Sequence, residues 1–195
     1  MELILASGNV HKKQEFSSIL DGHSIVLPQE IGIDFQFEET GHSYLENSLG
    51  KAMSLYKRTG SPVFADDSGL SVPALNGAPG IYSARYGSNN DGQKLSDAER
   101  NTYLLNKMKD LEDRNAFFVC CIVLIIEEYR IFSAQETLSG VIAEAPSGVG
   151  GFGYDPVFFV PKLGKTVAEL SDSEKNRISH RGRAAAKIQS ILETL

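Results

Sequence analysis

The sequence predicts an α/β fold, and three observations support this class. Short apolar runs alternate along the chain with segments in which apolar residues repeat at helical spacing. The first run, residues 2–6, leads through a Ser-Gly-Asn turn into a polar helix. The longest run, residues 117–126, is continuous enough to form a strand that is buried on both faces. The length of 195 residues leads us to expect one domain with two lobes, spanning residues 1–195.

The composition limits the possible partners and compartments. The chain has 42% hydrophobic residues, and 19 Lys and Arg against 25 Asp and Glu give a net charge of −6. An acidic chain lacks the basic surface that nucleic acid requires, so no nucleic-acid partner is expected. No basic leader and no window of about 18 apolar residues is present, so we expect a cytoplasmic protein without a membrane partner. Cys120 and Cys121 are predicted to be free core thiols, because strand neighbours point to opposite faces.

The turn after the first strand is a candidate phosphate site. The helix that follows it, from about Val10 to Leu20, is predicted to place Phe16, Ile19 and Leu20 inward. Its first turn presents free backbone N–H groups and the positive end of the helix dipole, and Lys12 and Lys13 add charge. A simple Ser-Gly-Asn helix cap explains the turn equally well, although a cap needs neither Asn9 nor Lys12.

Two adjacent carboxylates form the most distinctive feature of the sequence. A predicted strand, residues 62–65, ends at Asp66 and Asp67, where open α/β sheets place their ligands. Only one of the two can face a given ligand, so we assign Asp67 to the ligand and Asp66 to bracing the turn. The alternative is an Asx turn that only closes the strand. The following loop is predicted to be packed, with Leu70, Val72, Leu75 and Ile81 buried.

Before this strand, residues 23–37 predict a second strand and an irregular return that ends at Glu38 and Glu39. Paired glutamates before a glycine are typical of a solvated turn, but they are also hard oxygen donors of the kind that Mg²⁺ accepts. A helix over about residues 43–58 should follow, with Asn47 and Lys51 on its polar side. Its predicted apolar stripe consists of Leu45, Leu49, Ala52, Met53 and Tyr56.

The second half of the chain predicts a helix, a sheet region and a long terminal helix. The polar segment GSNNDGQK (87–94) precedes a capping box at residues 96–99 that opens the helix. Strands are expected over residues 117–126, 130–137, 139–145 and 157–160. Between the last two, the glycine-rich turn 146–153 leads to Phe152, Tyr154 and Asp155, which could stack and hydrogen-bond a planar base or could pack in the core.

A second capping box at residues 171–174 opens a helix that is predicted to run to Leu195. This helix contains the densest basic cluster of the chain: Lys175, His180, Arg181 and Arg183, with Ser179 and Gly182 among them. A glycine in the middle of a helix costs about 1 kcal/mol relative to alanine, so Gly182 suggests a close backbone approach. A solvated helical face is the alternative explanation of the charges.

Five segments occur together in a recognisable order: SGNVHKKQE, EETGHSYLENSLGKA, FADDSGLSVPALNGAPGIYSARY, GGFGYDPVFF and EKNRISHRGRA. In their order and spacing they resemble the inosine/xanthosine triphosphate pyrophosphatase family, over nearly the whole chain. The resemblance implies a single dITP/XTP pyrophosphatase domain with an elongated, two-lobed fold. A mixed central sheet flanked by helices would have the active cleft between the lobes. It also implies a homodimer that uses Mg²⁺ to hydrolyse ITP, dITP and XTP to the monophosphate and pyrophosphate.

The resemblance also assigns roles to individual residues. Asp67 would be the proton acceptor and a metal ligand, and Glu38 would assist the metal, with Glu39 as the alternative. The phosphates would be held by Ser7, Gly8, Asn9, Val10, His11 and Lys12. The nucleotide would contact Ser68, Phe152, Gly153, Tyr154, Asp155, Lys175, His180 and Arg181. A donor such as Arg181 would favour a 6-keto purine over adenine, because adenine donates where hypoxanthine accepts.

Two other classes of function remain open at this point. A non-catalytic purine-nucleotide-binding regulatory protein would keep Lys12 and Arg181 but would not need Asp67 and Glu38. A metal phosphatase for ordinary nucleotides or sugar phosphates would release orthophosphate instead of pyrophosphate.

Overall fold

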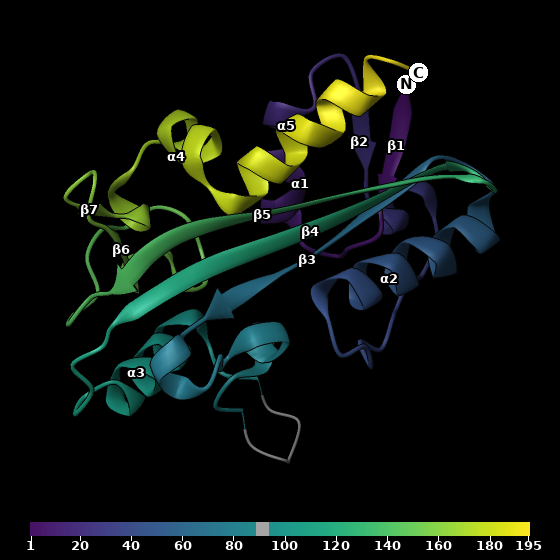
Figure 1. Cartoon of the computed structure of the whole chain (residues 1–195). Coiled ribbons are helices and arrows are strands. Elements are labelled where there is room, and N and C mark those ends of the chain that lie inside the picture. The colour runs from purple at the N-terminus through teal and green to yellow at the C-terminus, as the bar shows by residue number, and fades with distance from the viewer. Residues whose placement is uncertain (89–93) are drawn as a thin grey trace. The chain divides into compact units, whose positions relative to one another are not determined.

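The computed structural model describes residues 1–88 and 94–195 (Figure 1). Within these residues a seven-stranded sheet has the order β2-β1-β3-β4-β5-β6-β7. β1 pairs in parallel with β2 and β3, whereas β6 pairs antiparallel with β5 and β7, so the expected α/β class with a mixed sheet is confirmed. The strands are β1 (Glu2–Leu5), β2 (Ser24–Val26), β3 (Val63–Ser71), β4 (Asn115–Glu127), β5 (Arg130–Ile142), β6 (Phe158–Val160) and β7 (Lys165–Thr166).

Four of the described α-helices begin at a capping side chain, of which Ser179 was not predicted from the sequence. Asn9, Ser43, Ser96 and Ser179 each accept a hydrogen bond from a backbone N–H of the first turn. The α-helices are α1 (Val10–Ile19), α2 (Tyr44–Thr59), α3 (Asp97–Lys107), α4 (Asp172–Ile178) and α5 (His180–Leu192). Short 3₁₀ turns are η1 (Pro28–Ile31), η2 (Pro73–Leu75), η3 (Gly80–Arg85), η4 (Asp155–Val157) and η5 (Val167–Glu169). None of the described helices combines the length and the apolar character needed to cross a membrane.

The chain divides into two compact units. Unit 1 comprises residues 1–68, 120–136 and 179–195, and unit 2 comprises residues 69–119 and 137–178. Of the predicted polar segment 87–94, residues 89–93 lie outside the described part of the chain.

Unit 1 places a separate apolar core on each face of its strands. Leu3, Leu5 and Phe64 pack with α1 and α5, whereas Ile4, Val63 and Ala65 pack with α2. Neighbouring strand residues enter different cores because successive side chains point to opposite faces. Figure 1 shows α1 and α5 on one side of these strands and α2 on the other. The free thiols follow the same rule: Cys120 is in the first core, and both cysteines are buried and unbridged, as predicted.

Unit 2 has its own core between α3 and the strand segments of this unit. Leu104 and Met108 of α3 pack with Phe118, Phe158 and other buried residues of the unit. Leu70 and Val72 belong to the same core, as predicted. Leu75, which packs against this core, and Ile81 were also predicted to be buried but are only half-buried. This core anchors the segment that carries Phe152 to Asp155, because Tyr154 is one of its members.

Three predicted element boundaries were wrong. β3 does not end before the carboxylates but continues through Asp66 and Asp67 to Ser71. The expected strands 130–137 and 139–145 form one strand, β5. Leu138 does not interrupt it, because its side chain is buried on the same face of the strand as Ala134 and Ile142. The expected terminal helix is two helices, since the side chain of Ser179 accepts from Gly182 N–H and starts α5. Gly182 therefore lies in a first turn, not in mid-helix.

The predicted apolar stripe of α2 was also wrong in part. Leu45 and Leu49 are 46% and 38% exposed, whereas Asn47 and Lys51 are 1% and 8% exposed. The helix thus turns two polar residues toward the sheet, where apolar spacing alone would have placed leucines. Buried polar groups require hydrogen-bond partners, and Asn47 and Lys51 find theirs at Asp66 and Asp67.

Candidate active site

The aspartate pair lies just beyond the carboxyl end of β1. β1 and β3 pair through Leu5 and Phe64, and Ala6 N–H donates to the carbonyl of Phe64 at 2.8 Å. Asp66 and Asp67 follow directly and point to opposite faces of β3. Their opposite orientation was predicted from the alternation of a strand, but the helices that each carboxylate contacts were not.

Asp66 is enclosed by cations. It is 1% exposed, Lys12 Nζ lies 2.9 Å from its Oδ1, and Arg181 Nε lies 3.5 Å from its Oδ2. Burial alone would raise the pKa of Asp66, but Lys12, Arg181 and Lys51 outweigh burial and lower this pKa well below its usual range. Asp66 is therefore a permanent anion that fixes two cations from α1 and α5.

Asp67 contacts side chains of α2 instead. It is 5% exposed, Asn47 Nδ2 donates to its Oδ2 at 3.0 Å, and Lys51 Nζ lies 3.7 Å from its Oδ1. Burial raises the pKa of Asp67; Lys51 opposes this rise and the negative charge of Glu39 adds to it, so the net shift is upward. A carboxylate with a raised pKa is a better proton acceptor than an ordinary one.

Asn47 and Lys51 hold this carboxylate in place. The amide of Asn47 accepts from Gly41 N–H at 2.9 Å, which orients its NH₂ group toward Asp67. Lys51 Nζ donates to the carbonyl of Asp66 at 2.8 Å and to Glu39 Oε1 at 2.6 Å. Burial would lower the pKa of Lys51, but Asp66, Asp67 and Glu39 raise it, so the ammonium stays charged.

The sequence placed Asn47 and Lys51 only on the polar side of a helix and gave them no role in the site. Their spacing of four residues on one helical face was visible, but a solvated face gives the same spacing. Asn47 packs against a loop residue, Gly41, whose contact no helical periodicity encodes.

The two adjacent glutamates differ in surroundings. Glu38 is exposed, whereas Glu39 is half-buried and forms the ion pair with Lys51. The structure thus brings Glu39 together with Lys51 and Asp67. Among residues 1–88 and 94–195 no group of three or more His, Cys, Asp and Glu could hold a metal ion.

The Ser-Gly-Asn turn has the geometry of a helix cap with a basic first turn. Asn9 accepts from Lys12 N–H at 3.2 Å, and Asn9 N–H donates to Ser7 Oγ at 3.1 Å. Gly8, Val10 and His11 are exposed there. Lys12 points back to Asp66, whereas Lys13 forms a bidentate ion pair with Glu30 at 2.6 and 2.7 Å.

Three further predicted residues lie in unit 1. Arg181 is 3% exposed, donates to Glu15 Oε2 at 2.6 Å and donates to Ser68 Oγ at 2.8 Å. His180, the first residue of α5, is 6% exposed. Glu15 was not predicted as a site residue. The sequence offered one signal for it: Asn9, Lys12 and Glu15 recur every three residues and therefore lie along one side of the predicted helix.

The remaining predicted residues lie together in unit 2. Asp155 is buried, and its Oδ2 accepts from Lys175 Nζ at 2.8 Å and from Phe152 N–H at 2.9 Å. Lys175 Nζ also lies 4.8 Å from the centre of the half-buried Phe152 ring. Tyr154, by contrast, is a core residue whose hydroxyl donates to the carbonyl of Ser83 at 2.8 Å.

Two glycines shape this turn. Gly151 and Gly153 have φ angles of +69° and +63°, in the left-handed region that side chains with a Cβ rarely adopt. A Cβ on Gly151 would lie 2.1 Å from Asp155 Oδ2. The glycine-rich segment therefore allows the close approach of Gly151 to Asp155 and the hydrogen bond between Phe152 and Asp155.

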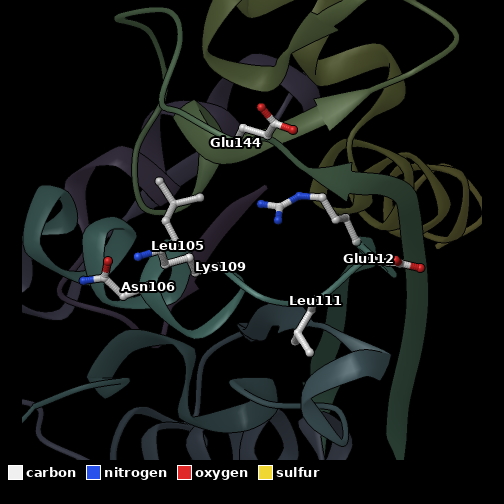
Figure 2. A pocket seen from close by; sticks show the side chains of 7 residues that line it. Leu105, Asn106, Lys109, Leu111, Glu112 and Glu144 are labelled. Atoms are coloured by element: carbon white, nitrogen blue, oxygen red, sulfur yellow. The ribbon is translucent and has the colours of Figure 1, made fainter.

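One cavity of about 620 Å³ lies elsewhere in unit 2, at the C-terminal end of α3 (Figure 2). Arg114, one of its lining residues, donates to the carbonyls of Met108, Ile142 and Ala143. None of the predicted site residues lines this cavity; its other lining residues are Leu105, Asn106, Lys109, Leu111, Glu112 and Glu144.

Comparison with known proteins places this arrangement in a family. The chain is 53% identical over 193 residues to the dITP/XTP pyrophosphatase of Treponema denticola, covering 99% of each chain. It is 46% identical over 189 residues to that of Shigella flexneri, covering 94% and 93% of the two chains.

Solved structures agree with the sequence relatives. The Staphylococcus aureus Ham1 protein matches with a TM-score of 0.88 and 43% identity, covering 100% of this chain and 99% of that one. A HAM1 protein from Coxiella burnetii matches with a TM-score of 0.89 and 40% identity over the whole of both chains. The sequence pattern of the Ham1 family matches residues 3–191. The resemblance found in the sequence is thereby confirmed, and the chain belongs to the Ham1 family.

Proposed function

We propose that this chain hydrolyses the deaminated purine nucleoside triphosphates ITP, dITP and XTP to a nucleoside monophosphate and pyrophosphate. Removing these nucleotides would keep their bases out of DNA and RNA. The observation that carries the proposal is the contrast between the adjacent buried aspartates: Lys12 and Arg181 lie 2.9 and 3.5 Å from Asp66, whereas Asn47 donates to Asp67 and Lys51 lies 3.7 Å from it. These surroundings lower the pKa of Asp66 and leave that of Asp67 raised by burial. A carboxylate whose pKa is raised is the better candidate for accepting a proton, which favours Asp67 over Asp66 as the general base. The names of the relatives support the same activity.

In the proposed reaction a water oxygen attacks the α-phosphorus, and the bond to the oxygen that bridges the α- and β-phosphorus breaks. Asp67 accepts the proton of the attacking water, and pyrophosphate leaves with the electron pair of the broken bond. Lys12 and the backbone N–H groups at the start of α1 hold the phosphates, together with Ser7, Gly8, Asn9, Val10 and His11. Ser68, His180 and Arg181 contribute nucleotide contacts from unit 1.

Mg²⁺ is the proposed cofactor. The Lys51 ammonium lies 2.6 Å from Glu39 Oε1 and 3.7 Å from Asp67 Oδ1, so these two carboxylates already share one cation. Two carboxylate oxygens, completed by water and substrate phosphates, are the usual protein contribution to a Mg²⁺ site. We therefore propose Asp67 and Glu39, in place of Glu38, as the residues that would hold the metal. When bound, the metal would neutralise negative charge on the phosphates.

The test of the function is turnover of ITP, XTP, dITP, ATP and GTP with Mg²⁺, with pyrophosphate and orthophosphate measured separately. We expect pyrophosphate from the three deaminated nucleotides and little turnover of ATP and GTP. Orthophosphate as the product would indicate a phosphatase. Binding of ITP without any turnover would indicate the regulatory protein instead.

The adjacent glutamates offer a matched pair of variants. Glu39→Gln is expected to lower kcat/KM at limiting Mg²⁺ by about tenfold or more, whereas Glu38→Gln should stay within about twofold of the wild type. The measurement is a Mg²⁺ titration of activity, with EDTA-treated enzyme as the zero point. A larger loss in Glu38→Gln than in Glu39→Gln would restore Glu38 as the metal ligand.

For the base we propose a set of residues in unit 2: Phe152, Gly153, Tyr154, Asp155 and Lys175. Phe152 is the stacking candidate, because the Tyr154 ring belongs to the core whereas Phe152 is half-buried. The carboxylate of Asp155, held by Lys175, is the candidate for polar contact with the base. Gly153 and Tyr154 would contribute through the backbone of the turn.

Phe152→Ala is expected to raise KM for ITP by about tenfold with a smaller change in kcat, because stacking is worth about 1–3 kcal/mol per base. Steady-state kinetics with ITP checks this, and Phe117→Ala in β4 is a control for loss of a ring outside the proposed set. An unchanged KM would assign the Phe152 ring to packing.

The remaining parts of the proposal follow from the family resemblance. We propose a homodimer that acts in the cytoplasm, where the nucleotide pool is found. Sedimentation equilibrium of the purified chain tests the dimer, since a mass of one chain at all concentrations would contradict it.

A further inference from the structure

The N-terminal turn of α3 contacts the proposed base-binding turn. Asp97 Oδ2 accepts from Gly153 N–H at 2.6 Å, and Asn101 Nδ2 donates to the carbonyl of Gly153 at 3.0 Å. One residue of the turn is thus held at both of its backbone polar groups by two side chains one helical turn apart. Gly153 lies between Phe152 and Tyr154 and has a φ angle of +63°.

The side chain of Asp97 is itself held by Arg100. Arg100 pairs with Asp97, and its Nη1 donates to the carbonyl of Ala84 at 2.6 Å. Its guanidinium carbon lies 5.9 Å from the centre of the Tyr154 ring. Arg100 is 9% exposed, so this contact is buried and connects α3 with η3 and the turn.

Asn101 is poorly explained by stability alone. It is 4% exposed, and its Oδ1 has no hydrogen-bond partner in residues 1–88 and 94–195. A buried polar atom without a partner is unfavourable, and an apolar side chain at this position would avoid that cost. The amide does provide the one interaction that an apolar residue lacks, its hydrogen bond to Gly153.

We propose that Asp97 and Asn101 are positioning residues for base selection: they hold Gly153 so that Phe152 and Asp155 keep the orientation that favours a deaminated purine. The inference rests on the proposed role of residues 152–155. Because selection depends on the position of the stacking ring and the carboxylate, loosening Gly153 should affect KM and selectivity more than the chemical step at Asp67.

The first test is Asn101→Leu, with Asn106→Leu as the matched control on an exposed position of the same helix. We expect Asn101→Leu to raise KM for ITP about fivefold, to lower the ratio of kcat/KM between ITP and GTP, and to leave kcat nearly unchanged. Asn106→Leu should match the wild type. Unchanged KM and selectivity in a folded Asn101→Leu protein would overturn the proposal.

Asp97 provides a second test that does not depend on a buried substitution, since its side chain is 49% exposed. Asp97→Ala removes the acceptor of Gly153 N–H and should raise KM and accelerate hydrogen exchange of the Gly153 amide. Asp97→Asn keeps an acceptor oxygen and should restore both. Equal KM and equal exchange in Asp97→Ala and the wild type would contradict the proposal.

The amide exchange separates this inference from the base-binding proposal. If Phe152→Ala raises KM while the Asp97 and Asn101 variants do not, only the positioning role fails. If Gly153 exchanges faster in those variants but Phe152→Ala leaves KM unchanged, the assignment of the base turn fails.

Discussion

Replacing Asp67 by Asn is expected to lower kcat for ITP by at least about 100-fold while ITP still binds. The amide keeps the size of the side chain and an oxygen that can accept from Asn47, but it cannot take a proton from water. It also removes one of the two carboxylates proposed for the metal. The measurement combines steady-state kinetics with calorimetric titration of ITP.

Asp110→Asn serves as the control, because Asp110 is an exposed aspartate outside the proposed site. It should keep wild-type kcat and KM. Turnover of Asp67→Asn within about tenfold of the wild type would remove Asp67 from proton transfer.

The second large effect concerns stability. Asp66→Asn is expected to lower the free energy of unfolding by about 3 kcal/mol, because removing one partner of a buried ion pair leaves uncompensated charge. The charges left behind are those of Lys12 and Arg181, which lie 2.9 and 3.5 Å from the Asp66 carboxylate oxygens. Urea unfolding followed by circular dichroism measures the change.

The neighbouring aspartate is the matched control for this measurement. Burial raises the pKa of Asp67, so its charged form is disfavoured in the folded state. Asp67→Asn should therefore unfold at the same urea concentration as the wild type or a higher one. A similar loss of stability in both variants would show that the two environments do not differ as the geometry indicates.

The pH dependence of the Asp66 effect has a definite sign. The pKa of Asp66 is lowered in the folded state, so its contribution is fully present above its unfolded value of about 3.9. It is lost only as the pH falls through the lower folded value. The stability difference between wild type and Asp66→Asn should thus be constant from about pH 5 to 8 and shrink in stronger acid.

The fold class could be predicted from the sequence because strand and helix periodicities are local properties. The capped start of α3 followed from Ser96, whose side chain bonds within its own first turn. Asn9, which a cap was not expected to need, is the side chain that caps α1, so that expectation was wrong. The break at Ser179 did not follow, since apolar spacing continued through it and the capping of Gly182 N–H was not anticipated.

The sequence by itself also determined that Asp66 and Asp67 point in opposite directions, because successive side chains of a strand alternate between its two faces. Only the tertiary structure decided what each carboxylate meets: Lys12 and Arg181 at Asp66, Asn47 and Lys51 at Asp67. These partners lie from 16 to 115 positions away in the chain. A pKa depends on such distances and on burial, neither of which is a property of a local pattern, and so the division of roles between the two aspartates became visible only in the fold.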